Sequence, residues 1–127
     1  MVNQDLPAES KKIQNWLKNR GFDYQVIMLE DSARSAKEAA DALKCQVEQI
    51  AKSIVLRAEK SNKPVLAIVG GANKIDMEKL SLMVGEKVVK ADADYVKEVS
   101  GFSIGGIPPI GHKNKMNVFI DEELNKQ

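Results

Sequence analysis

Two short apolar runs separated by a polar loop constrain the fold of this chain more than any other feature. The first run is Ile54-Val55-Leu56, and the second, Val65-Leu66-Ala67-Ile68-Val69, is apolar at five consecutive positions. The polar segment 59–64 between them has the composition of a hairpin loop, so we expect two neighbouring strands. Because the second run never alternates with polar residues, it should be buried on both faces of a sheet.

Helical and strand patterns surround this hairpin. Apolar residues at helical spacing, with capping residues at the ends, predict helices at 6–20, 35–43, 76–85 and 94–101. Branched and aromatic residues predict further strands at 24–29, 87–90 and 118–120. A helical turn is expected at 47–50 and a helical tail at 121–125. Because the order mixes hairpins with helical crossovers, we predict an α/β (α+β) fold with a mixed sheet and helices packed around it.

Size and composition predict a single domain, residues 1–127, in the cytoplasm. The length of 127 residues suits one domain, since domains commonly run to about 100–150 residues. The single cysteine, Cys45, excludes an intrachain disulfide and is typical of a reducing compartment. No apolar run approaches the ~18 residues that cross a bilayer, and the first ten residues do not resemble a signal peptide. We therefore expect no membrane partner.

The charge balance bears on possible nucleic-acid partners. The chain has 19 basic and 18 acidic residues and a net charge of only +1. Proteins that coat a long stretch of DNA or RNA usually have a strong positive excess, so DNA is not an expected partner. A protein that touches only the end of a tRNA needs no more than a few lysines.

The common catalytic signatures are absent from the sequence. It has no nucleophile elbow, no phosphate-binding loop and no Cys/His cluster with metal spacing. Gly70-Gly71 follows a predicted strand, but without the third glycine of a dinucleotide-binding loop it is better interpreted as a turn. We therefore expect neither a cofactor nor a metal ion.

The segment from Gly101 to His112 holds four glycines and two prolines in twelve residues. Such a segment cannot form a helix or a regular central strand, because proline lacks the N–H group that both structures use. A loop of this kind can present backbone N–H groups to a bound oxygen, as an oxyanion hole does. It can equally be a structural turn whose course the prolines set, and the residues alone leave both interpretations open.

Two further residues have an ordinary interpretation and a functional one. Lys52 stands between a predicted helical turn and a buried strand, where it is either a solvated lysine or a point charge that holds a phosphate. His112 is the only histidine and ends the glycine-proline loop. It is either a capping or packing residue or a catalytic group, since histidine is the residue type that titrates near neutral pH.

Several of these segments together resemble a known family. The run AKSIVLR at 51–57 resembles the lysine-bearing strand start of the YbaK family, which includes relatives of the editing domain inserted in bacterial prolyl-tRNA synthetases. VSGF at 99–102 and GGIPPIGH at 105–112 resemble the family's Gly-x-x-x-Pro loop. The segment 65–70 also matches in order, and the resemblance extends from Trp16 to Leu124.

The resemblance implies a fold and an activity. The fold would be a mixed, partly closed sheet flanked by helices. The activity would be trans-editing: hydrolysis of the ester that links a wrong, small amino acid such as Ala, Cys, Ser or Thr to its tRNA, here tRNA(Pro). The implied partners are the 3′ acceptor end of an aminoacyl-tRNA and an aminoacyl-tRNA synthetase.

The resemblance also implies roles for individual residues. Lys52 would lie near the terminal adenosine or its phosphate, and the backbone from Gly105 to Pro109 would orient the ester carbonyl or the attacking water. The predicted catalytic residues are Lys52, Gly105 and His112. The predicted substrate-binding residues are Gly101, Phe102, Gly106, Ile107, Pro108, Pro109 and Gly111.

One departure from the family leaves other functions open. Family chains generally continue past Asp121-Glu122 into a glycine-rich strand and a final helix, whereas this sequence ends at Gln127, so the domain is expected to be short at its C-terminus. The alternatives are a binding module that captures an aminoacyl-tRNA end or assists a synthetase without hydrolysis, and a small-molecule binding domain on the same scaffold.

Overall fold

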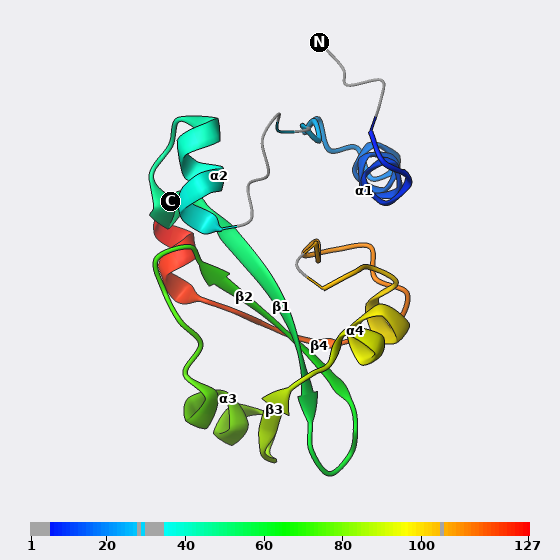
Figure 1. Cartoon of the computed structure of the whole chain (residues 1–127), viewed down its shortest axis with the longest axis vertical. Coiled ribbons are helices and arrows are strands. Elements are labelled where there is room, and N and C mark those ends of the chain that lie inside the picture. The colour runs from blue at the N-terminus through cyan, green and yellow to red at the C-terminus, as the bar shows by residue number, and fades with distance from the viewer. Residues whose placement is uncertain (1–5, 28, 30–34, 105) are drawn as a thin grey trace.

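The computed structural model describes residues 6–27, 29, 35–104 and 106–127, and its centre is a four-stranded mixed sheet (Figure 1). The strands, in the order β3-β1-β2-β4, are β1 (Ala51–Ala58), β2 (Pro64–Gly70), β3 (Val88–Lys90) and β4 (Asn117–Ile120). β1 is antiparallel to both β2 and β3, and β2 is parallel to β4. The predicted mixed sheet is therefore confirmed.

Helices surround this sheet, as predicted. They are α1 (Ala8–Asn19), α2 (Ala36–Leu43), α3 (Met77–Val84), α4 (Ala93–Ser100) and the 3-10 helices η1 (Val47–Gln49) and η2 (Glu122–Lys126). Ser35 and Asp76 each cap a helix by accepting a hydrogen bond from the backbone N–H three residues later. Gly85 and Gly101 end α3 and α4 with φ values of 94° and 83°, which favour glycine.

The β1–β2 hairpin forms the core, because side chains of both strands pack on the two faces of the sheet. Val65 and Ala67 pack on one face, in a cluster that includes Leu80 of α3. Leu66 and Ile68 pack on the other, in a cluster that α4 completes. Five consecutive apolar residues are buried because helices cover this strand on both sides.

The predicted strand at 24–29 is wrong for the residues described there. Tyr24 to Ile27 and Leu29 lie outside any strand, and the Tyr24 side chain is 68% exposed. The side-chain amide of Gln14 on α1 takes the place of a partner strand. Its Nε2 donates to the Tyr24 carbonyl at 2.9 Å, and its Oε1 accepts from the Val26 N–H at 2.7 Å. The segment therefore follows α1 rather than joining the sheet.

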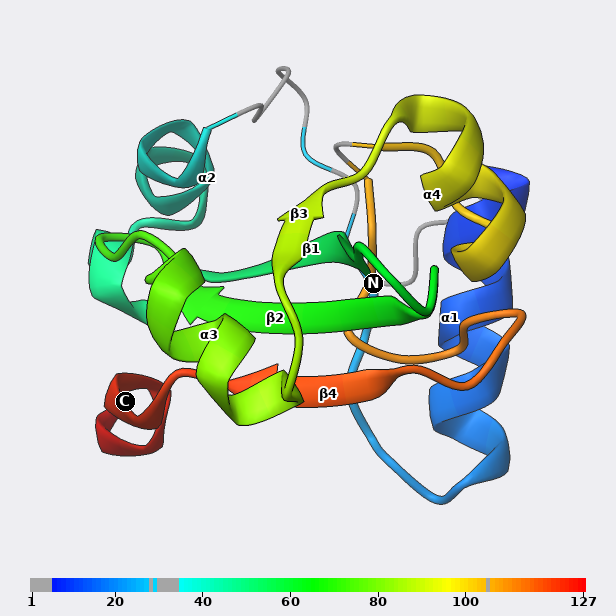
Figure 2. The ribbon, with the colours of Figure 1, turned by 90° about the horizontal axis from the view of Figure 1, so that it is seen from below.

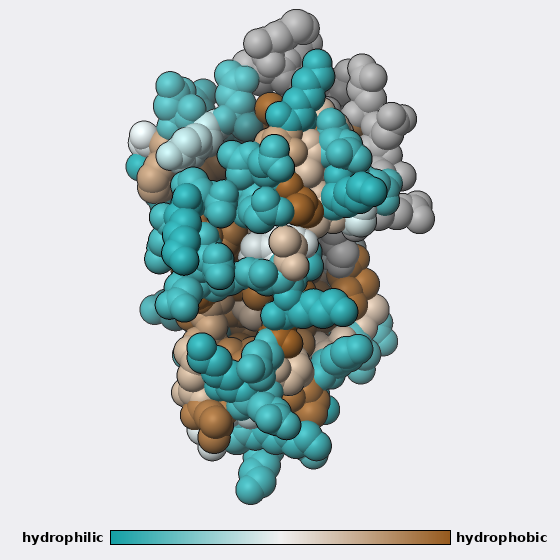
Figure 3. Space-filling model, turned by 90° about the vertical axis from the view of Figure 1, so that its left-hand side faces the viewer, coloured by the Kyte–Doolittle hydropathy of each residue, from teal (hydrophilic) through white to brown (hydrophobic). Residues whose placement is uncertain are grey.

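The helices sit at different places around the sheet (Figure 2). α2 and η1 lie at the end of the β1–β2 hairpin opposite its turn, while α1 lies apart from the sheet, with the glycine-proline loop between it and α4 (Figures 1 and 2). Polar residues cover most of the face that includes α2 and α3, with separate apolar areas between them (Figure 3). No helix in the described ranges is both long and apolar enough to cross a membrane.

Candidate active site

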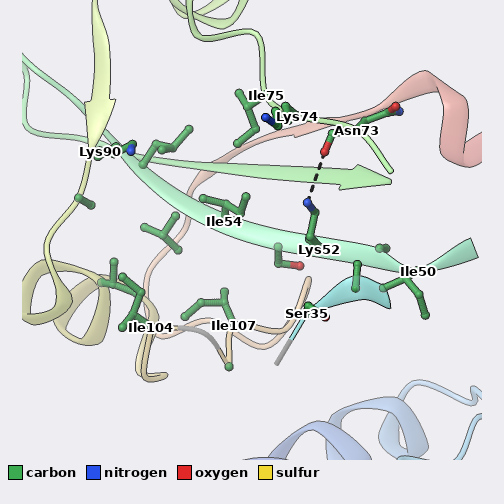
Figure 4. Close-up of a pocket in the computed structure, with 18 of the residues that line it drawn as sticks. Ser35, Ile50, Lys52, Ile54, Asn73, Lys74, Ile75, Lys90, Ile104 and Ile107 are labelled. Carbon is green, nitrogen blue, oxygen red and sulfur yellow. Dashed lines mark hydrogen bonds between the residues drawn. The ribbon is translucent and has the colours of Figure 1, made fainter. Parts of the chain in front are cut away.

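A cavity of about 700 Å³ lies beside β1, between α2, the segment that follows β2, and the glycine-proline loop (Figure 4). A volume of this size is in the usual range of small-molecule binding pockets. Its polar lining residues are Ser35, Lys52, Ser53, Asn73, Lys74 and Lys90. The apolar lining includes Ile50, Ile54, Ile75, Ile104 and Ile107.

The cavity lies along an edge of β1 that β3 leaves open. β3 pairs with β1 only at residues 56–58. The Ala58 N–H donates to the Lys63 carbonyl at 2.9 Å, and the Gly71 N–H donates to the Ile50 carbonyl at 2.6 Å, so even-numbered residues of β1 bond to β2. Because this pattern alternates along an antiparallel pair, the backbone N–H and C=O of Ser53 point away from β2, toward the cavity.

Lys52 is one of three lysines that line this cavity. Its Nζ donates a hydrogen bond of 3.3 Å to the backbone carbonyl of Asn73, and the two groups point toward each other in Figure 4. An ammonium group has three donors, so two remain for a ligand. Lys74 and Lys90 add positive charge to the lining, and none of the described lining residues is acidic.

A hydrogen-bond network fixes the segment that holds the Lys52 ammonium. Asp121 accepts from the Asn73 side-chain amide at 2.6 Å and from the Gly70 N–H at 3.1 Å through Oδ2, and from the Glu123 N–H at 3.0 Å through Oδ1. The Asn73 side-chain hydrogen bond, together with those from the Gly70 and Glu123 backbone, lowers the pKa of the Asp121 carboxyl below its ordinary value. The ionised Asp121 thus ties the turn after β2 to η2.

The glycine-proline loop reaches the cavity through Ile104, Gly106 and Ile107. The Gly106 N–H already donates to the Ser103 carbonyl at 2.9 Å, and prolines 108 and 109 have no N–H to offer. The Ile107 N–H donates to no other backbone group among the described residues. The Ile104 N–H likewise donates to no other backbone group there, so Ile104 and Ile107 are the described lining residues of this loop that can offer an N–H to an oxyanion. Gly105, the predicted catalytic glycine, lies outside the described residues.

His112 forms a hydrogen bond within the glycine-proline loop and does not line the cavity. Its Nε2 lies 2.6 Å from the Pro108 carbonyl oxygen. Since a carbonyl can only accept, Nε2 carries the hydrogen in this contact. The imidazole also meets the Phe102 ring edge-on, at 6.2 Å between centroids and 88° between planes.

Several other predicted site residues also lie away from the cavity. Phe102, predicted to bind substrate, is only 1% exposed and belongs to the core. Gly101 ends α4, and Gly111, with a φ of 77°, passes close to Ile13 of α1. The two prolines, 108 and 109, are likewise not among the lining residues. The prediction that these five residues contact the substrate directly remains untested. In this structure they shape the loop.

Sequence reasoning missed Ser53 and Asn73. Ser53 is noted from the sequence only as part of the run AKSIVLR. Because side chains alternate along a strand, the residue after Lys52 lies on the opposite face of the sheet, and Ser53 lines the cavity there. Asn73 follows Gly70-Gly71 in a segment interpreted simply as a turn. Its carbonyl becomes a lysine partner only because the hairpin returns that turn to the start of β1.

Comparison with known proteins identifies the family of this chain. A sequence model described as "Aminoacyl-tRNA editing domain" matches residues 30–127. The chain belongs to the aminoacyl-tRNA editing domain family. The resemblance to YbaK-like proteins is therefore confirmed, together with the α/β fold.

One solved structure and two curated proteins illustrate what this editing domain is similar to. A structure described as "Crystal structure of a putative trans-editing enzyme for prolyl tRNA synthetase" is 38% identical, with a TM-score of 0.89 over 97% of this chain and 78% of that one. The "Putative Cys-tRNA(Pro)/Cys-tRNA(Cys) deacylase EbsC" of Enterococcus faecalis is 30% identical over 82% of this chain. A proline–tRNA ligase of Thermodesulfovibrio yellowstonii is 30% identical over 78% of it.

The editing domain spans only part of these curated relatives. It covers 63% of the Enterococcus protein and 17% of the Thermodesulfovibrio ligase. It also covers 64% of the uncharacterized protein YwhH of Bacillus subtilis, at 30% identity over 80% of this chain.

Proposed function

We propose that this editing domain is an aminoacyl-tRNA deacylase that hydrolyses the ester between a small amino acid and the terminal ribose of a misacylated tRNA. The observation that carries the proposal is that Lys52, on β1, and Gly106 and Ile107, in the glycine-proline loop, line one cavity. These residues are far apart in the sequence, and together they offer a cation, a backbone donor and an apolar wall.

The cavity supports a reaction in which water is the nucleophile. Its described lining has no carboxylate, imidazole or thiol that could act as a base or nucleophile. An aminoacyl ester is already activated, so a positioned water molecule, assisted by the neighbouring ribose hydroxyl of the substrate, can attack its carbonyl carbon. The water loses a proton as the tetrahedral intermediate forms, and the ribose oxygen gains one when the ester bond breaks. The rate gain then comes from orientation and from electrostatic stabilisation.

Each polar group has a defined task in this proposal. The Lys52 ammonium, held by the Asn73 carbonyl, uses its remaining donors to bind a phosphate or ribose oxygen of the terminal adenosine. The backbone N–H groups of the lining residues Ser53, Ile104 and Ile107 are the candidates to stabilise the oxyanion. Lys74 and Lys90 attract the polyanionic tRNA end.

The apolar part of the cavity favours a small side chain. Ile104 and Ile107 line the cavity on the face of the sheet that α4 covers, whereas Ile54 and Ile75 line it on the face that α3 covers (Figure 4). Discrimination by size alone is worth about 1–3 kcal/mol per methylene, so we expect activity on more than one of Ala, Cys, Ser and Thr. The relatedness to proline–tRNA ligases and to the Enterococcus protein supports tRNA(Pro) as the carrier.

Single-turnover hydrolysis tests the proposal. Ala-, Cys- and Ser-tRNA(Pro), with Pro-tRNA(Pro) as the correct ester, are incubated with the wild-type chain, Lys52→Ala and the control Lys63→Ala. Lys63 lies in the β1–β2 loop, away from the cavity. We expect wild type and Lys63→Ala to cleave at least one misacylated ester while sparing Pro-tRNA(Pro), and Lys52→Ala to lose this activity. Binding of tRNA without cleavage of any ester would instead support a binding module.

A further inference from the structure

Four side chains at the C-terminal end of α1 form a line that we call the aromatic array: Arg20, Trp16, Phe22 and Tyr24. The Arg20 guanidinium lies 4.0 Å from the Trp16 ring centroid. The Trp16 and Phe22 rings are parallel within 2° at 6.5 Å, and the Phe22 and Tyr24 rings lie 6.1 Å apart at 20°. Phe22 is 47% exposed and Tyr24 is more exposed still, so ring surface faces solvent.

The backbone holds these rings in place although they are not buried. The Phe22 N–H donates to the Leu17 carbonyl at 3.0 Å, which folds the chain back onto α1. The Gln14 amide then bonds the backbone on both sides of residue 25, as described above. Exposed aromatic rings on a fixed backbone are a costly arrangement for packing alone and a suitable one for binding, because little entropy is lost when a flat ligand stacks on them.

α1, which contains Trp16 and leads into the rest of the array, is basic, although the chain as a whole is nearly neutral. The basic residues between 8 and 20 are Lys11, Lys12, Lys18 and Arg20. Glu9 is the only acidic residue there, and the Lys97 ammonium pairs with it at 3.1 Å. Positive charge beside exposed aromatic rings is the combination with which proteins bind single-stranded nucleic acid.

The aromatic array also adjoins the candidate active site. A Cβ atom on Gly111 would lie 2.8 Å from Ile13 Cδ1 and 3.8 Å from Trp16 Cδ1, so the glycine-proline loop packs directly against the array. The same loop lines the cavity through Ile107. Figure 1 shows α1 next to this loop, with α4 on the other side of the loop. The array and the cavity thus lie on opposite sides of one loop.

We propose that the aromatic array binds single-stranded RNA by stacking unpaired bases on Phe22 and Tyr24, with the basic residues of α1 contacting the phosphates. The inference rests on the proposed function to the extent that these bases would be the unpaired nucleotides next to the aminoacylated end. Stacking tolerates any base sequence, because every base has an aromatic face, so the array would add affinity without selecting the tRNA.

Intrinsic fluorescence of the full chain tests this directly, because Trp16 is its only tryptophan. The chain is titrated with the ribonucleotide 5′-ACCA-3′ and, separately, with an abasic ribose-phosphate of the same length. We expect ACCA to change the Trp16 signal and the abasic strand to bind far more weakly. Phe22→Ala and Tyr24→Ala should each weaken ACCA binding by about five-fold to a hundred-fold, the range measured for loss of one base–aromatic stack.

Matched variants separate stacking from other causes. Tyr24→Phe keeps the ring and should retain affinity, and so should Leu82→Ala, which removes an exposed apolar side chain from α3. Equal binding of the abasic strand, or unchanged affinity of both alanine variants, would overturn the inference and leave a protein partner as the other explanation of the array. The titration uses no ester and is repeated with Lys52→Ala, so its failure is distinguishable from a failure of the proposed deacylase activity.

Discussion

The side-chain amide of Asn73 donates a 2.6 Å hydrogen bond to Asp121, a residue 48 positions further along the chain. The backbone carbonyl of the same asparagine accepts from the Lys52 Nζ at 3.3 Å. Asn73 therefore joins the C-terminal helix η2 to the cation of the cavity. The position of that cation depends on a carboxylate that does not itself line the cavity.

This network predicts a pH dependence of stability. The pKa of Asp121 is lowered in the folded state, so the folded chain binds fewer protons there than the unfolded chain. The stabilisation is fully present above the unfolded pKa of about 4 and is lost as the pH falls through the lower, folded value. Thermal unfolding of wild type and Asp121→Asn from pH 7 to pH 3 measures this. The variant should unfold at a lower temperature at pH 7, and the gap should narrow in the acidic range.

A matched control is available at Asp94, which lies on the exposed first turn of α4. Asp94→Asn removes the same charge without touching the network around Asn73. If the difference in unfolding temperature from wild type shrinks equally for both variants as the pH falls, the effect comes from net charge and the assignment to Asp121 is wrong.

Gly71 is predicted to be intolerant of any side chain. A Cβ there would collide with the Val47 backbone carbonyl and lie 2.9 Å from the Ala36 Cβ. Overpacking of this kind typically costs about 1–3 kcal/mol, and here it would also displace α2, whose Ala36 lines the cavity. Gly71→Ala should therefore lower both stability and deacylation, as measured by denaturant unfolding and single-turnover assays.

The adjacent Gly70 provides the control for this substitution. Its nearest neighbour to an added Cβ is the Asp121 Oδ2 at 3.5 Å, an ordinary contact distance. Gly70→Ala should stay close to wild type in both assays. Equal losses at the two positions would mean that the close approach of η1 to Gly71 is not what limits the substitution.

His112 is predicted to act by holding the glycine-proline loop. His112→Ala removes the hydrogen bond to the Pro108 carbonyl, which should cost about 1 kcal/mol of stability and loosen the wall formed by Ile107. His112→Gln keeps an N–H donor and should recover much of the activity. Single-turnover rates over a pH series distinguish this from chemistry. If His112 were a general base, the glutamine variant would be as inactive as the alanine variant. The fall in the single-turnover rate at low pH that a base produces would also be absent from both variants.

Much of the architecture could be predicted because its causes are local. The capping residues Ser35 and Asp76 and the terminal glycines Gly85 and Gly101 stand next to the helices that they begin or end. The burial of β2 follows from five consecutive apolar residues. The family could also be inferred, since its motifs are contiguous in the sequence.

The strand predicted at 24–29 was wrong for the opposite reason. Its branched and aromatic residues have the propensity of a strand, but a strand also needs a partner with free backbone groups. The Gln14 side chain bonds the backbone there in place of a partner strand, and Tyr24 stacks with Phe22 beside α1. Propensity describes a residue, whereas pairing is decided by what lies next to it in space.

The sequence by itself determined the hairpin, the helix ends, the family and the two elements of the candidate site, the lysine at the start of a strand and the glycine-proline loop. Only the tertiary structure decided how these elements work together. In the structure, the Lys52 ammonium donates to the Asn73 carbonyl, and the Gly106 N–H donates to the Ser103 carbonyl within the loop. His112 hydrogen bonds to the Pro108 carbonyl and does not line the cavity. The Lys52–Asn73 contact joins residues 21 positions apart, so it depends on sheet register and packing. The two loop contacts join near neighbours, but the course of the loop depends on what it packs against, such as Ile13 of α1 beside Gly111, and no local pattern encodes that.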